Sequence, residues 1–358
     1  MMPIEEKRKK IDSVDEKILT LLNDRAKLAK GISVEKGKNG AAVYVPERER
    51  AVLKNIISKN KGPLSNKALE SIYRNIVSEC RALEASLKIA YLGPATTFTH
   101  MAAIKNFGSS CEFIPLNSIN DVFAEVEKGS ADYGVVPIEN STEGTINHTL
   151  DTFMKSNLNI VAEIMLDIKH NLLSKHKLSE IKKIYSRPSA LAQCRGWISN
   201  NLPKAEIIES SSTAKAAELA TLYHSSAAIA SELAAEQYSL KIVSKNIQDS
   251  AHNVTRFLVI GKTKPKRSTE NKTSIMFSVK NEPGTLFNAL ESFPKNGINM
   301  TKIESRPARK KGWDVVFFID FEGYVEDKNI QKALEGIKES CVFVKILGSY
   351  PLEVTVSE

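Results

Sequence analysis

Apolar side chains recur at helical spacing through the first part of the chain. From Ile4 to about Lys36 they follow a 3-4-3-4 pattern that is typical of a coiled-coil seam, and the seam consists of Ile11, Val14, Ile18, Leu21, Leu28 and Ile32. A second helix is predicted to begin at Pro46, and a third to run from a Ser65 cap to about Ser86. Because these helices have no core of their own, residues 1–88 are expected to form an all-α, intertwined dimer.

Between residues 89 and 262 the pattern changes to short apolar runs that alternate with amphipathic ones, which indicates α/β architecture. Strands are predicted at Ile89–Pro94 (with its closing turn), Glu112–Pro115, Tyr133–Pro137, Leu158–Asp167, Lys183–Tyr185, Glu206–Glu209, Ala227–Ala230 and Arg256–Ile260. Helices are predicted at Ser118–Lys128, Ser189–Asn200 and Ala214–Tyr223.

A polar linker, Lys262–Thr269, separates this region from a differently built tail at residues 272–350. The order of predicted elements there is Thr273–Val279 (strand), Thr285–Lys295 (helix), Met300–Glu304 (strand), Asp314–Asp320 (strand), Asn329–Ser340 (helix) and Val342–Leu347 (strand). This βαββαβ order is typical of a ferredoxin-like α+β sandwich. The chain is therefore expected to contain three domains.

Composition is that of an ordinary globular chain, with 42% hydrophobic and 26% charged residues. No apolar run is long enough to span a membrane, and no apolar signal core follows the N-terminus, so a cytoplasmic location is the default expectation. The four cysteines and six histidines are scattered without metal-ligand spacing, and glycine-rich nucleotide fingerprints are missing. Neither a metal nor a cofactor is expected.

The positive charge is concentrated in the helical part. Residues 1–88 hold 19 Lys and Arg against 12 Asp and Glu, which is +7 of the total net charge of +8. Such a segment could bind nucleic acid or a small polyanion, and a small anion ranks first because no nucleic-acid-binding module accompanies the charge. Arg25 occupies a seam position, where its charge needs either a buried acid or an anionic ligand. The sequence leaves both open.

Helix geometry limits which cations can share a ligand. Lys36 lies 11 residues after Arg25 and within about 20° of the same helix face, so the two side chains can converge on one dianion. Arg8 lies 17 residues before Arg25, roughly 25 Å along a straight helix. If Arg8 binds the same kind of ligand, it must serve the site of a neighbouring chain.

The helical part resembles the all-helical chorismate mutases. The residues at that family's spacing are Arg8, Lys10-Ile11-Asp12, Asp15-Glu16-Lys17, Arg25, Lys36 and Arg48-Glu49. The resemblance implies that Arg25, Arg48, Lys36 and a partner's Arg8 hold the chorismate dicarboxylate. Glu49 would bind the ring hydroxyl, and Lys36 would donate to the breaking ether oxygen. Catalysis would then consist of positioning and charge stabilisation.

Glu84 departs from this family's pattern, because it stands where part of the family has a Gln that donates to the same ether oxygen. A carboxyl can donate a hydrogen bond only when it is protonated. We therefore expect the mutase rate to rise towards acid pH, unless Glu84 is a solvated acid at a helix end. Val45 and Cys80 also replace family contacts, and they affect the periphery of the basic site.

Polar clusters follow several strand ends of the α/β part, where ligands bind in open sheets. The clusters are neutral and rich in hydroxyls and amides, which suits a small carboxylated molecule held in a two-lobed module. A periplasmic-type binding protein and an enzyme fit this pattern equally well. Thr255 and Arg256, where the last strand begins, could cap that strand or form the edge of an active site beside a regulatory domain.

Four stretches are similar to the prephenate dehydratases, and together they are highly specific: Gly93-Pro94-x-x-Thr97-Phe98-Thr99, Val136–Gly144, Tyr185-Ser186…Gln193-Cys194 and Thr255-Arg256-Phe257. The resemblance implies that Thr255 hydrogen-bonds or protonates the leaving hydroxyl and that Arg256 fixes the substrate or the geometry of the site. Asn140, Ser141, Ser186, Gln193 and Thr97 would line the cleft. Because a Thr hydroxyl is a very weak acid, hydrogen-bond assistance backed by Glu139 or water is favoured over full proton donation.

Two departures from the dehydratase pattern concern loop geometry. Thr96 replaces a Gly that is common in the first loop, which affects the position of Thr97, and Arg187-Pro188-Ser189 replaces a His-Pro-Gln pattern. His100, His148 and His170 are expected to be surface or capping residues rather than catalysts.

The tail looks like an ACT regulatory domain. Gly284-Thr285-Leu286-Phe287 corresponds to that family's Gly-Ala-Leu-Val stretch, and Glu304-Ser305-Arg306-Pro307 matches its Glu-Ser-Arg-Pro stretch. The resemblance implies that phenylalanine binds at Gly284, Thr285, Leu286, Glu304, Ser305 and Arg306, between two such domains of a homodimer. The alternative is a domain that only dimerises.

The expected function is a bifunctional enzyme that takes chorismate to prephenate and prephenate to phenylpyruvate under feedback by L-phenylalanine. It would act as a homodimer, or as a tetramer, without nucleic acid or membrane. Two rivals remain: a dehydratase whose helical part only dimerises, and a non-catalytic regulator that binds an amino acid.

Overall fold

The computed structural model describes residues 3–38, 42–307 and 315–353, and within α1 the side chains at 34 and 36–38 fall outside the description. Contacts divide the chain into two compact units, which are described separately. The first holds the N-terminal helices together with the segment Phe107–Glu112. The second holds residues 88–106 and 113–353. None of the described helices combines the length and apolarity needed to cross a membrane.

The first unit contains three helices, α1 (Ile4–Lys38), α2 (Pro46–Ser58) and α3 (Asn66–Ala82). Ser65 caps α3 as predicted, because its hydroxyl accepts a hydrogen bond from the Ala68 amide at 3.2 Å. The prediction that this helix continues to Ser86 is wrong, since it ends at Ala82 and Glu84 lies in the following turn. The predicted seam of α1 is exposed in the single chain, with Leu21 at 67% and Leu28 at 71% exposure.

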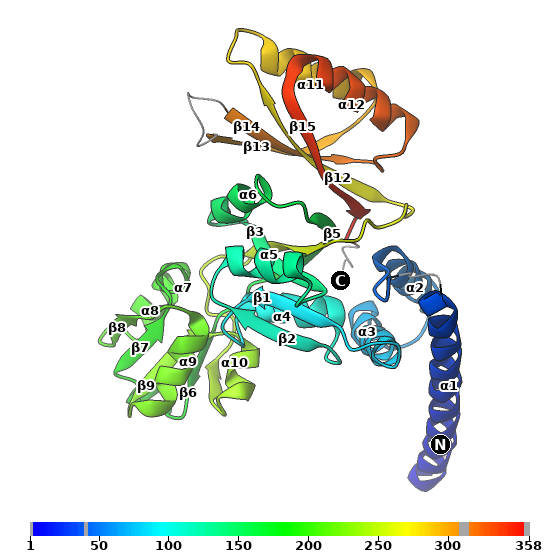
Figure 1. The fold of residues 1–358 in the computed structure, drawn as a ribbon. Coiled ribbons are helices and arrows are strands. Elements are labelled where there is room, and N and C mark those ends of the chain that lie inside the picture. The colour runs from blue at the N-terminus through cyan, green and yellow to red at the C-terminus, as the bar shows by residue number, and fades with distance from the viewer. Residues whose placement is uncertain (1–2, 39–41, 308–314, 354–358) are drawn as a thin grey trace. The chain divides into compact units, whose positions relative to one another are not determined.

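The second unit begins with a six-stranded sheet in the order β2-β1-β3-β11-β5, with β4 paired to β3 (Figure 1). Its strands are β1 (Lys88–Leu92), β2 (Glu112–Leu116), β3 (Tyr133–Asn140), β4 (Gly144–Thr145), β5 (Asn159–Asp167) and β11 (Val254–Gly261). The accompanying helices are α4 (Phe98–Phe107), α5 (Ile119–Lys128) and α6 (Asn147–Phe153). Strand β11 returns from the far end of the sequence and lies antiparallel between β3 and β5.

A second sheet of five strands follows, in the order β10-β6-β9-β7-β8. Its strands are β6 (Asn171–Ser174), β7 (Lys183–Ser186), β8 (Glu206–Glu209), β9 (Ser226–Ala230) and β10 (Lys241–Ser244). Its helices are α7 (Pro188–Gln193), α8 (Arg195–Asn201), α9 (Thr213–Leu222) and α10 (Glu232–Gln237), and a single 3₁₀ turn covers Leu178–Glu180.

One predicted helix of this lobe is divided in two. The single helix predicted at Ser189–Asn200 is interrupted at Cys194, which has non-helical backbone angles (φ −117°, ψ 12°). Asp249 accepts hydrogen bonds from the amides of Gly196 and Trp197 at 2.9 and 3.1 Å, and these are orphan donors of the first turn of α8. The break therefore depends on a residue far along the chain.

The third sheet has four antiparallel strands in the order β13-β14-β12-β15. Its elements are β12 (Asn271–Val279), α11 (Thr285–Lys295), β13 (Met300–Pro307), β14 (Val315–Glu322), α12 (Lys328–Ser340) and β15 (Cys341–Pro351). Helices α11 and α12 pack together over one face (Figure 1). Met276, Phe318 and Leu347 on the other face share a hydrophobic core with Ile160 and Leu258 of the first sheet. This common core explains why the two sheets belong to one compact unit.

The end of the described chain lies on the edge of the first sheet. Strand β5 is the last strand of that sheet. The Glu353 carboxylate accepts a hydrogen bond from the Met165 amide of β5 and pairs with Lys105 at 3.3 Å. The backbone of Glu353 also donates to the Glu163 carboxylate at 3.3 Å. A carboxylate from the tail thus satisfies an edge amide that would otherwise face solvent.

Candidate active sites

The predicted cations of the helical unit are spread along its helices. Arg8 is exposed and pairs with its helical neighbour Glu5 at 2.8 Å. Arg25 is half-buried on α1, and Arg48 is exposed in the first turn of α2. The side chain of Lys36 lies outside the described residues. Arg8 and Arg25 lie 17 residues apart on α1, so one chain does not bring these two side chains to one ligand.

Glu49 is held by Arg81, a residue that the sequence analysis did not select. Nη1 of Arg81 donates to the Glu49 carboxylate at 2.6 Å, and Nη2 donates to the Phe107 carbonyl. The guanidinium also lies over the rings of Tyr44 and Phe107, 5.5 and 5.7 Å from their centroids. Burial opposes its charge, but the charge and hydrogen bond of Glu49, together with Cys111 and Tyr44, outweigh burial and raise the pKa of Arg81. Arg81 is thus a buried cation that fixes the orientation of a predicted catalytic carboxylate.

A cavity of about 360 Å³ lies in the second unit, lined by residues of the first sheet and by loops and helices that flank the second sheet. Thr97, Asn140, Gln193 and Thr255, four of the predicted cleft residues, line this cavity. They come from the β1–α4 loop, β3, α7 and β11. The strand ends therefore meet at one place, as expected for ligand sites of α/β sheets.

A chain of hydrogen-bonded amide side chains runs along the wall of the cavity. Backbone amides fix the orientation of Asn140, and this assigns the donor and acceptor of each bond in the chain. Asn140 Oδ1 accepts from the Thr142 and Glu143 amides at 2.9 and 3.0 Å, so its Nδ2 must be the group that donates to Asn253 Oδ1 at 2.9 Å. Asn253 Nδ2 then donates to Gln193 Oε1 at 2.8 Å. Gln193 Nε2 donates onward to the Glu143 carboxylate at 2.9 Å.

Thr255 is prepared as a hydrogen-bond donor by this chain. Asn140 Nδ2 donates to Thr255 Oγ1 at 2.8 Å, so the Thr255 oxygen is an acceptor in that contact. Its own proton is then available to a group in the cavity, and the accepted bond strengthens the donation. Thr255 is 7% exposed, which keeps this donor away from bulk water.

His170 is not a surface residue, and the expectation that it lies at the surface or caps an element is wrong. It is 2% exposed, lines the cavity, and packs edge-on against Phe98 with ring centroids 5.4 Å apart. Its Nε2 lies 2.8 Å from Gln193 Oε1, an acceptor, so Nε2 carries the proton and Nδ1 is an acceptor. Burial lowers the pKa of His170 despite Gln193 and Glu143, which keeps the ring neutral.

The other two histidines differ in their surroundings. His148 is exposed, as expected, whereas His100 is half-buried and stacks on Tyr91 with ring centroids 4.6 Å apart. The Thr96 amide donates to His100 Nδ1 at 3.1 Å, which agrees with a capping role. Burial lowers the pKa of His100 as well.

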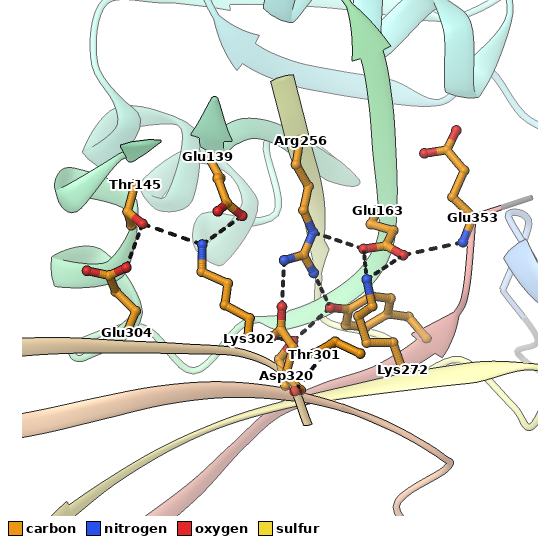
Figure 2. A network of polar contacts seen from close by, with 12 residues as sticks. Glu139, Thr145, Glu163, Arg256, Lys272, Thr301, Lys302, Glu304, Asp320 and Glu353 are labelled. Carbon is orange, nitrogen blue, oxygen red and sulfur yellow. Dashed lines mark hydrogen bonds and ion pairs between the residues drawn. The ribbon is translucent and has the colours of Figure 1, made fainter. Parts of the chain in front are cut away.

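Three predicted cleft residues lie outside the wall of the cavity. Ser141 is exposed and accepts from the Val254 amide at 3.0 Å, which ties the end of β3 to β11. Ser186 is fully buried and donates to the Ile229 carbonyl at 2.7 Å. Arg256 points to the side of β11 opposite Thr255, because successive residues of a strand face opposite sides. Figure 2 shows its side chain among polar residues of the third sheet.

The first turns of two helices border the cavity. Thr97, Phe98 and Thr99 stand at the beginning of α4, and Ser212 and Thr213 stand at the beginning of α9. Ser212 caps α9 by accepting from the Lys215 amide at 3.0 Å. Amides at helix N-termini carry partial positive charge and bind carboxylates without a cationic side chain. Among the described residues, no cluster of His, Cys, Asp and Glu could hold a metal ion.

A smaller cavity of about 280 Å³ lies at the start of α11, where Gly284, Thr285 and Leu286 line it together with Phe287 and Phe317. The second predicted stretch lies elsewhere, on β13. Glu304 accepts from the Thr145 hydroxyl at 2.7 Å, Arg306 pairs with Asp151 at 2.9 Å, and Ser305 is exposed. In one chain the two predicted phenylalanine-binding stretches are therefore not neighbours in the same cavity.

Comparison with known proteins explains the order of these parts. The chain matches three family models: chorismate mutase type II at residues 7–85, prephenate dehydratase at 89–265 and the ACT domain at 273–339. It is 51% identical over 356 residues to the bifunctional chorismate mutase/prephenate dehydratase of Aquifex aeolicus (strain VF5), covering 98% of both chains. The chain belongs to the bifunctional chorismate mutase/prephenate dehydratase family. The enzyme of the same name from Pseudomonas aeruginosa is 45% identical, with 97% of both chains covered.

A solved structure is similar to the dehydratase and ACT parts. This is the prephenate dehydratase of Arthrobacter aurescens in complex with L-Phe, which is 33% identical and has a TM-score of 0.69. The similarity covers 74% of this chain and 90% of that one. Chorismate mutase, prephenate dehydratase and ACT domains thus follow one another, with a helical N-terminus and a sheet-containing dehydratase.

Within the dehydratase part, Thr96 has a backbone conformation that glycine adopts more readily than other residues. Its φ is +66°, a left-handed conformation that is costly for a β-branched residue. The Thr96 carbonyl accepts from the Ser231 hydroxyl at 2.9 Å, which connects the loop to the second sheet. Thr97 lines the cavity although Thr96 stands at the preceding position.

Proposed function

We propose that this chain converts chorismate to prephenate in its mutase part and prephenate to phenylpyruvate in its dehydratase part, and that L-phenylalanine bound to the ACT domain inhibits the second reaction. The observation that carries the proposal is the match of three family models in one order, together with a relative of that name that aligns over 98% of the chain. The described cavity in the dehydratase part supports it with a chemically suitable wall.

In the mutase part, Arg25, Arg48 and Lys36 would bind the two carboxylates of chorismate, with Arg8 from a second chain. The rearrangement is pericyclic and needs no acid, base or covalent intermediate, so the protein contributes positioning and charge stabilisation. Arg81 would keep the Glu49 carboxylate oriented towards the ring hydroxyl of the substrate. Glu84 would donate to the ether oxygen only in its protonated form. Replacing it with Gln should therefore raise the mutase rate at neutral pH and flatten the pH profile between pH 5 and 8.

Dimerisation belongs to this proposal because the mutase site needs Arg8 of a partner. The exposed seam of α1 would pack against the same helix of a second chain, as its heptad-like spacing favours. The chain would act as a homodimer, and a tetramer remains compatible with the sequence. A ferredoxin-like ACT domain and a two-lobed dehydratase complete the proposed architecture. All four cysteines are free thiols, which suits the cytoplasmic location expected from the sequence.

The dehydratase reaction would proceed by loss of carbon dioxide and the ring hydroxyl. The bond between the ring and its carboxylate breaks, its electron pair forms a ring double bond, and the C–O bond to the hydroxyl breaks. The departing hydroxide takes up one proton from the solvent and leaves as water, while Thr255 keeps its own proton. Thr255, whose oxygen already accepts from Asn140, would donate a hydrogen bond to the leaving oxygen and lower the cost of its charge. The aromatic product supplies the driving force.

Binding of prephenate would depend on backbone amides. Its two carboxylates would lie at the N-termini of α4 and α9, which border the cavity. His170, Phe98 and Gln193 would surround the ring and exclude water, which strengthens each polar contact inside. A cavity of about 360 Å³ falls in the size range of small-ligand sites.

The decisive experiment assays both reactions of the purified full-length chain with and without L-phenylalanine. We expect chorismate to disappear, phenylpyruvate to appear from prephenate, and only the second rate to fall when phenylalanine is added. A chain that converts prephenate but not chorismate would be a dehydratase with a dimerising helical part. A chain that binds phenylalanine but converts neither substrate would be a regulator, and the proposal would be wrong.

A further inference from the structure

Arg256 belongs to a closed ring of hydrogen bonds that joins the dehydratase to the ACT sheet (Figure 2). Its Nε donates to Glu163 of β5 at 2.9 Å, Nη1 to Asp320 of β14 at 2.5 Å, and Nη2 to the Tyr350 hydroxyl of β15 at 2.9 Å. Ser274 of β12 donates to Asp320 at 2.5 Å, so Tyr350 must donate to Ser274, 2.7 Å away. Each donor in the ring has one acceptor.

The ring is buried and balanced in charge. The side chains of Arg256 and Glu163 are 9% and 2% exposed, and Lys272 adds a second cation 2.8 Å from Glu163. Two cations therefore face two carboxylates, Glu163 and Asp320. A buried arrangement of this kind cannot shift gradually, because each displaced charge would lose its partner in a medium of low dielectric constant. Movement of the ACT sheet must either move Arg256 with it or break the ring.

A second contact reaches the neighbouring strand. Lys302 of β13 pairs with Glu139 at 2.7 Å and lies 3.4 Å from the Thr145 hydroxyl, which in turn donates to Glu304 at 2.7 Å (Figure 2). Glu139 lies opposite Arg256 in the β3–β11 register, and Asn140 lies opposite Thr255. The Thr255–Asn140 pair thus has, on each strand, a directly adjacent residue whose side chain is bound by the ACT sheet.

We propose that Arg256 and Glu139 are positioning residues through which the ACT sheet sets the Thr255–Asn140 pair, so that a rearrangement of the sheet misplaces the Thr255 hydroxyl. This inference rests on the proposed function, and it assigns the route of regulation. The face of β13 that carries Lys302, Glu304 and Arg306 then transmits the state of the ACT domain. A displacement of about 1 Å is enough to lower turnover by about 100-fold.

The test uses the full-length chain and variants that remove one contact each. Tyr350→Phe opens the ring with one lost hydroxyl, and Lys302→Met frees Glu139. Lys345→Met is the matched control, because Lys345 also lies on β15 and binds the dehydratase. It donates to the Phe153 carbonyl at 3.1 Å, and its hydrogen bonds in the described structure go to neither β3 nor β11. Prephenate kinetics, the half-inhibitory concentration of L-phenylalanine, and its dissociation constant by equilibrium dialysis are measured for each protein.

For Tyr350→Phe and Lys302→Met we expect kcat to fall about tenfold with little change in KM, because the substrate site is intact while the donor is misplaced. The half-inhibitory concentration should rise relative to the dissociation constant by about 5- to 150-fold, the usual range of allosteric coupling. Lys345→Met should have the kcat of the wild type and the same half-inhibitory concentration relative to the dissociation constant. Arg256→Lys keeps the positive charge but cannot donate to Glu163, Asp320 and Tyr350 at once. It should therefore raise the half-inhibitory concentration relative to the dissociation constant, as the other two variants do.

Two results would separate the inference from the function on which it rests. The inference is wrong if phenylalanine inhibits the wild type and Tyr350→Phe and Lys302→Met do not differ from it. They would then have the same kcat and the same ratio of half-inhibitory concentration to dissociation constant. If the wild type converts prephenate but is not inhibited by phenylalanine, the regulatory part of the proposed function is wrong. The positioning role is then tested only by whether kcat falls in Tyr350→Phe and Lys302→Met. Should Tyr350→Phe not fold, Lys302→Met decides, since its side chain lies at the margin of the contact with 15% exposure.

Discussion

At the scale of single residues, Thr255 is defined by what its oxygen accepts. The bond from Asn140 uses a lone pair of the hydroxyl and leaves its proton for a group in the cavity. The sequence gives both residues, but the direction of the bond follows only from the amide chain through Asn253 and Gln193, which are distant in sequence. The hydroxyl is thus a donor fixed by its surroundings.

Removing this hydroxyl should abolish one reaction only. Thr255→Ala is expected to lower dehydratase turnover at least about 100-fold, the scale of lost proton or hydrogen-bond assistance at a leaving group. Thr255→Ser, which keeps the donor, should retain most of the activity. Phenylpyruvate absorbance measures the first rate, and chorismate disappearance measures the mutase, which should be unchanged in both variants. Equal loss of both activities would contradict the assignment.

Thr96 offers a test of backbone strain. A non-glycine residue at φ +66° costs about 1–2 kcal/mol, and its buried Oγ1 has no hydrogen-bond partner among the described residues. Thr96→Gly should stabilise the protein by about 1 kcal/mol after the extra chain entropy of glycine is subtracted. Urea unfolding measures the change. Thr99→Gly, inside α4 with ordinary backbone angles, should have the opposite sign, and a destabilised Thr96→Gly protein would show that the strain argument is wrong.

At the scale of elements, the spacing of apolar residues predicted most helices and strands. It could not predict breaks within an element that depend on residues distant in the sequence. All eight strands predicted between residues 89 and 262 are present, because apolar runs bounded by turns are a local signal. Strands β4, β6 and β10 and helices α6 and α10 were not predicted, since each is short. Helix α4 has ten residues and was also not predicted, because it begins inside a cluster of polar residues that follows β1. The break at Cys194 depends on Asp249, which no local pattern reveals.

The seam of α1 makes an element-scale prediction about assembly. Leu21→Glu would bury two charges in a dimer seam, so the chain should become monomeric and lose mutase activity. Asn23→Glu adds the same charge on the opposite side of α1 and should leave both properties unchanged. Sedimentation velocity and chorismate consumption are the measurements. A Leu21→Glu protein that stays dimeric and active would exclude the seam as the interface.

At the scale of the whole molecule, the candidate sites were found only in part from the sequence. The cavity residues Thr97, Asn140, Gln193 and Thr255 belong to motifs, so the resemblance identified them. Arg256 lies 64 residues before Asp320 and 94 before Tyr350, and only the tertiary fold brings these three side chains together. The sequence was interpreted to place Thr255 and Arg256 together at the edge of the cleft, whereas Arg256 binds Glu163, Asp320 and Tyr350. His170 could have been suspected because it closely follows the end of a predicted strand.

Whole-molecule stability should depend on pH through the buried histidines. Burial lowers the pKa of both His170 and His100 below the ordinary value of 6.5. Below that value the unfolded chain takes up protons that the folded chain does not, so stability is full above about pH 7 and falls as pH decreases. Each group can contribute at most about 1.4 kcal/mol per pH unit to this slope, and the more deeply buried His170 should contribute more than His100.

Urea unfolding at pH 7.5, 6.5 and 5.5 measures this slope. His170→Asn should remove the larger of the two contributions and flatten the dependence of the free energy of unfolding on pH, whatever the stability of the variant at pH 7.5. His148→Asn, at an exposed position, should leave the slope unchanged. A free energy of unfolding that is constant from pH 7.5 to 5.5 would contradict the argument.

The contact between Glu353 and the edge of β5 has a consequence for how the chain can be shortened. A chain cut after the dehydratase would expose the Met165 amide on an uncovered edge strand, together with apolar side chains such as Ile160 and Leu258 that now pack under the ACT sheet. Exposed edges with apolar neighbours recruit other strands and lead to aggregation. The C-terminal part is thus a solubility element as well as a sensor. An enzyme released from feedback is better sought by single substitutions in the polar ring than by truncation.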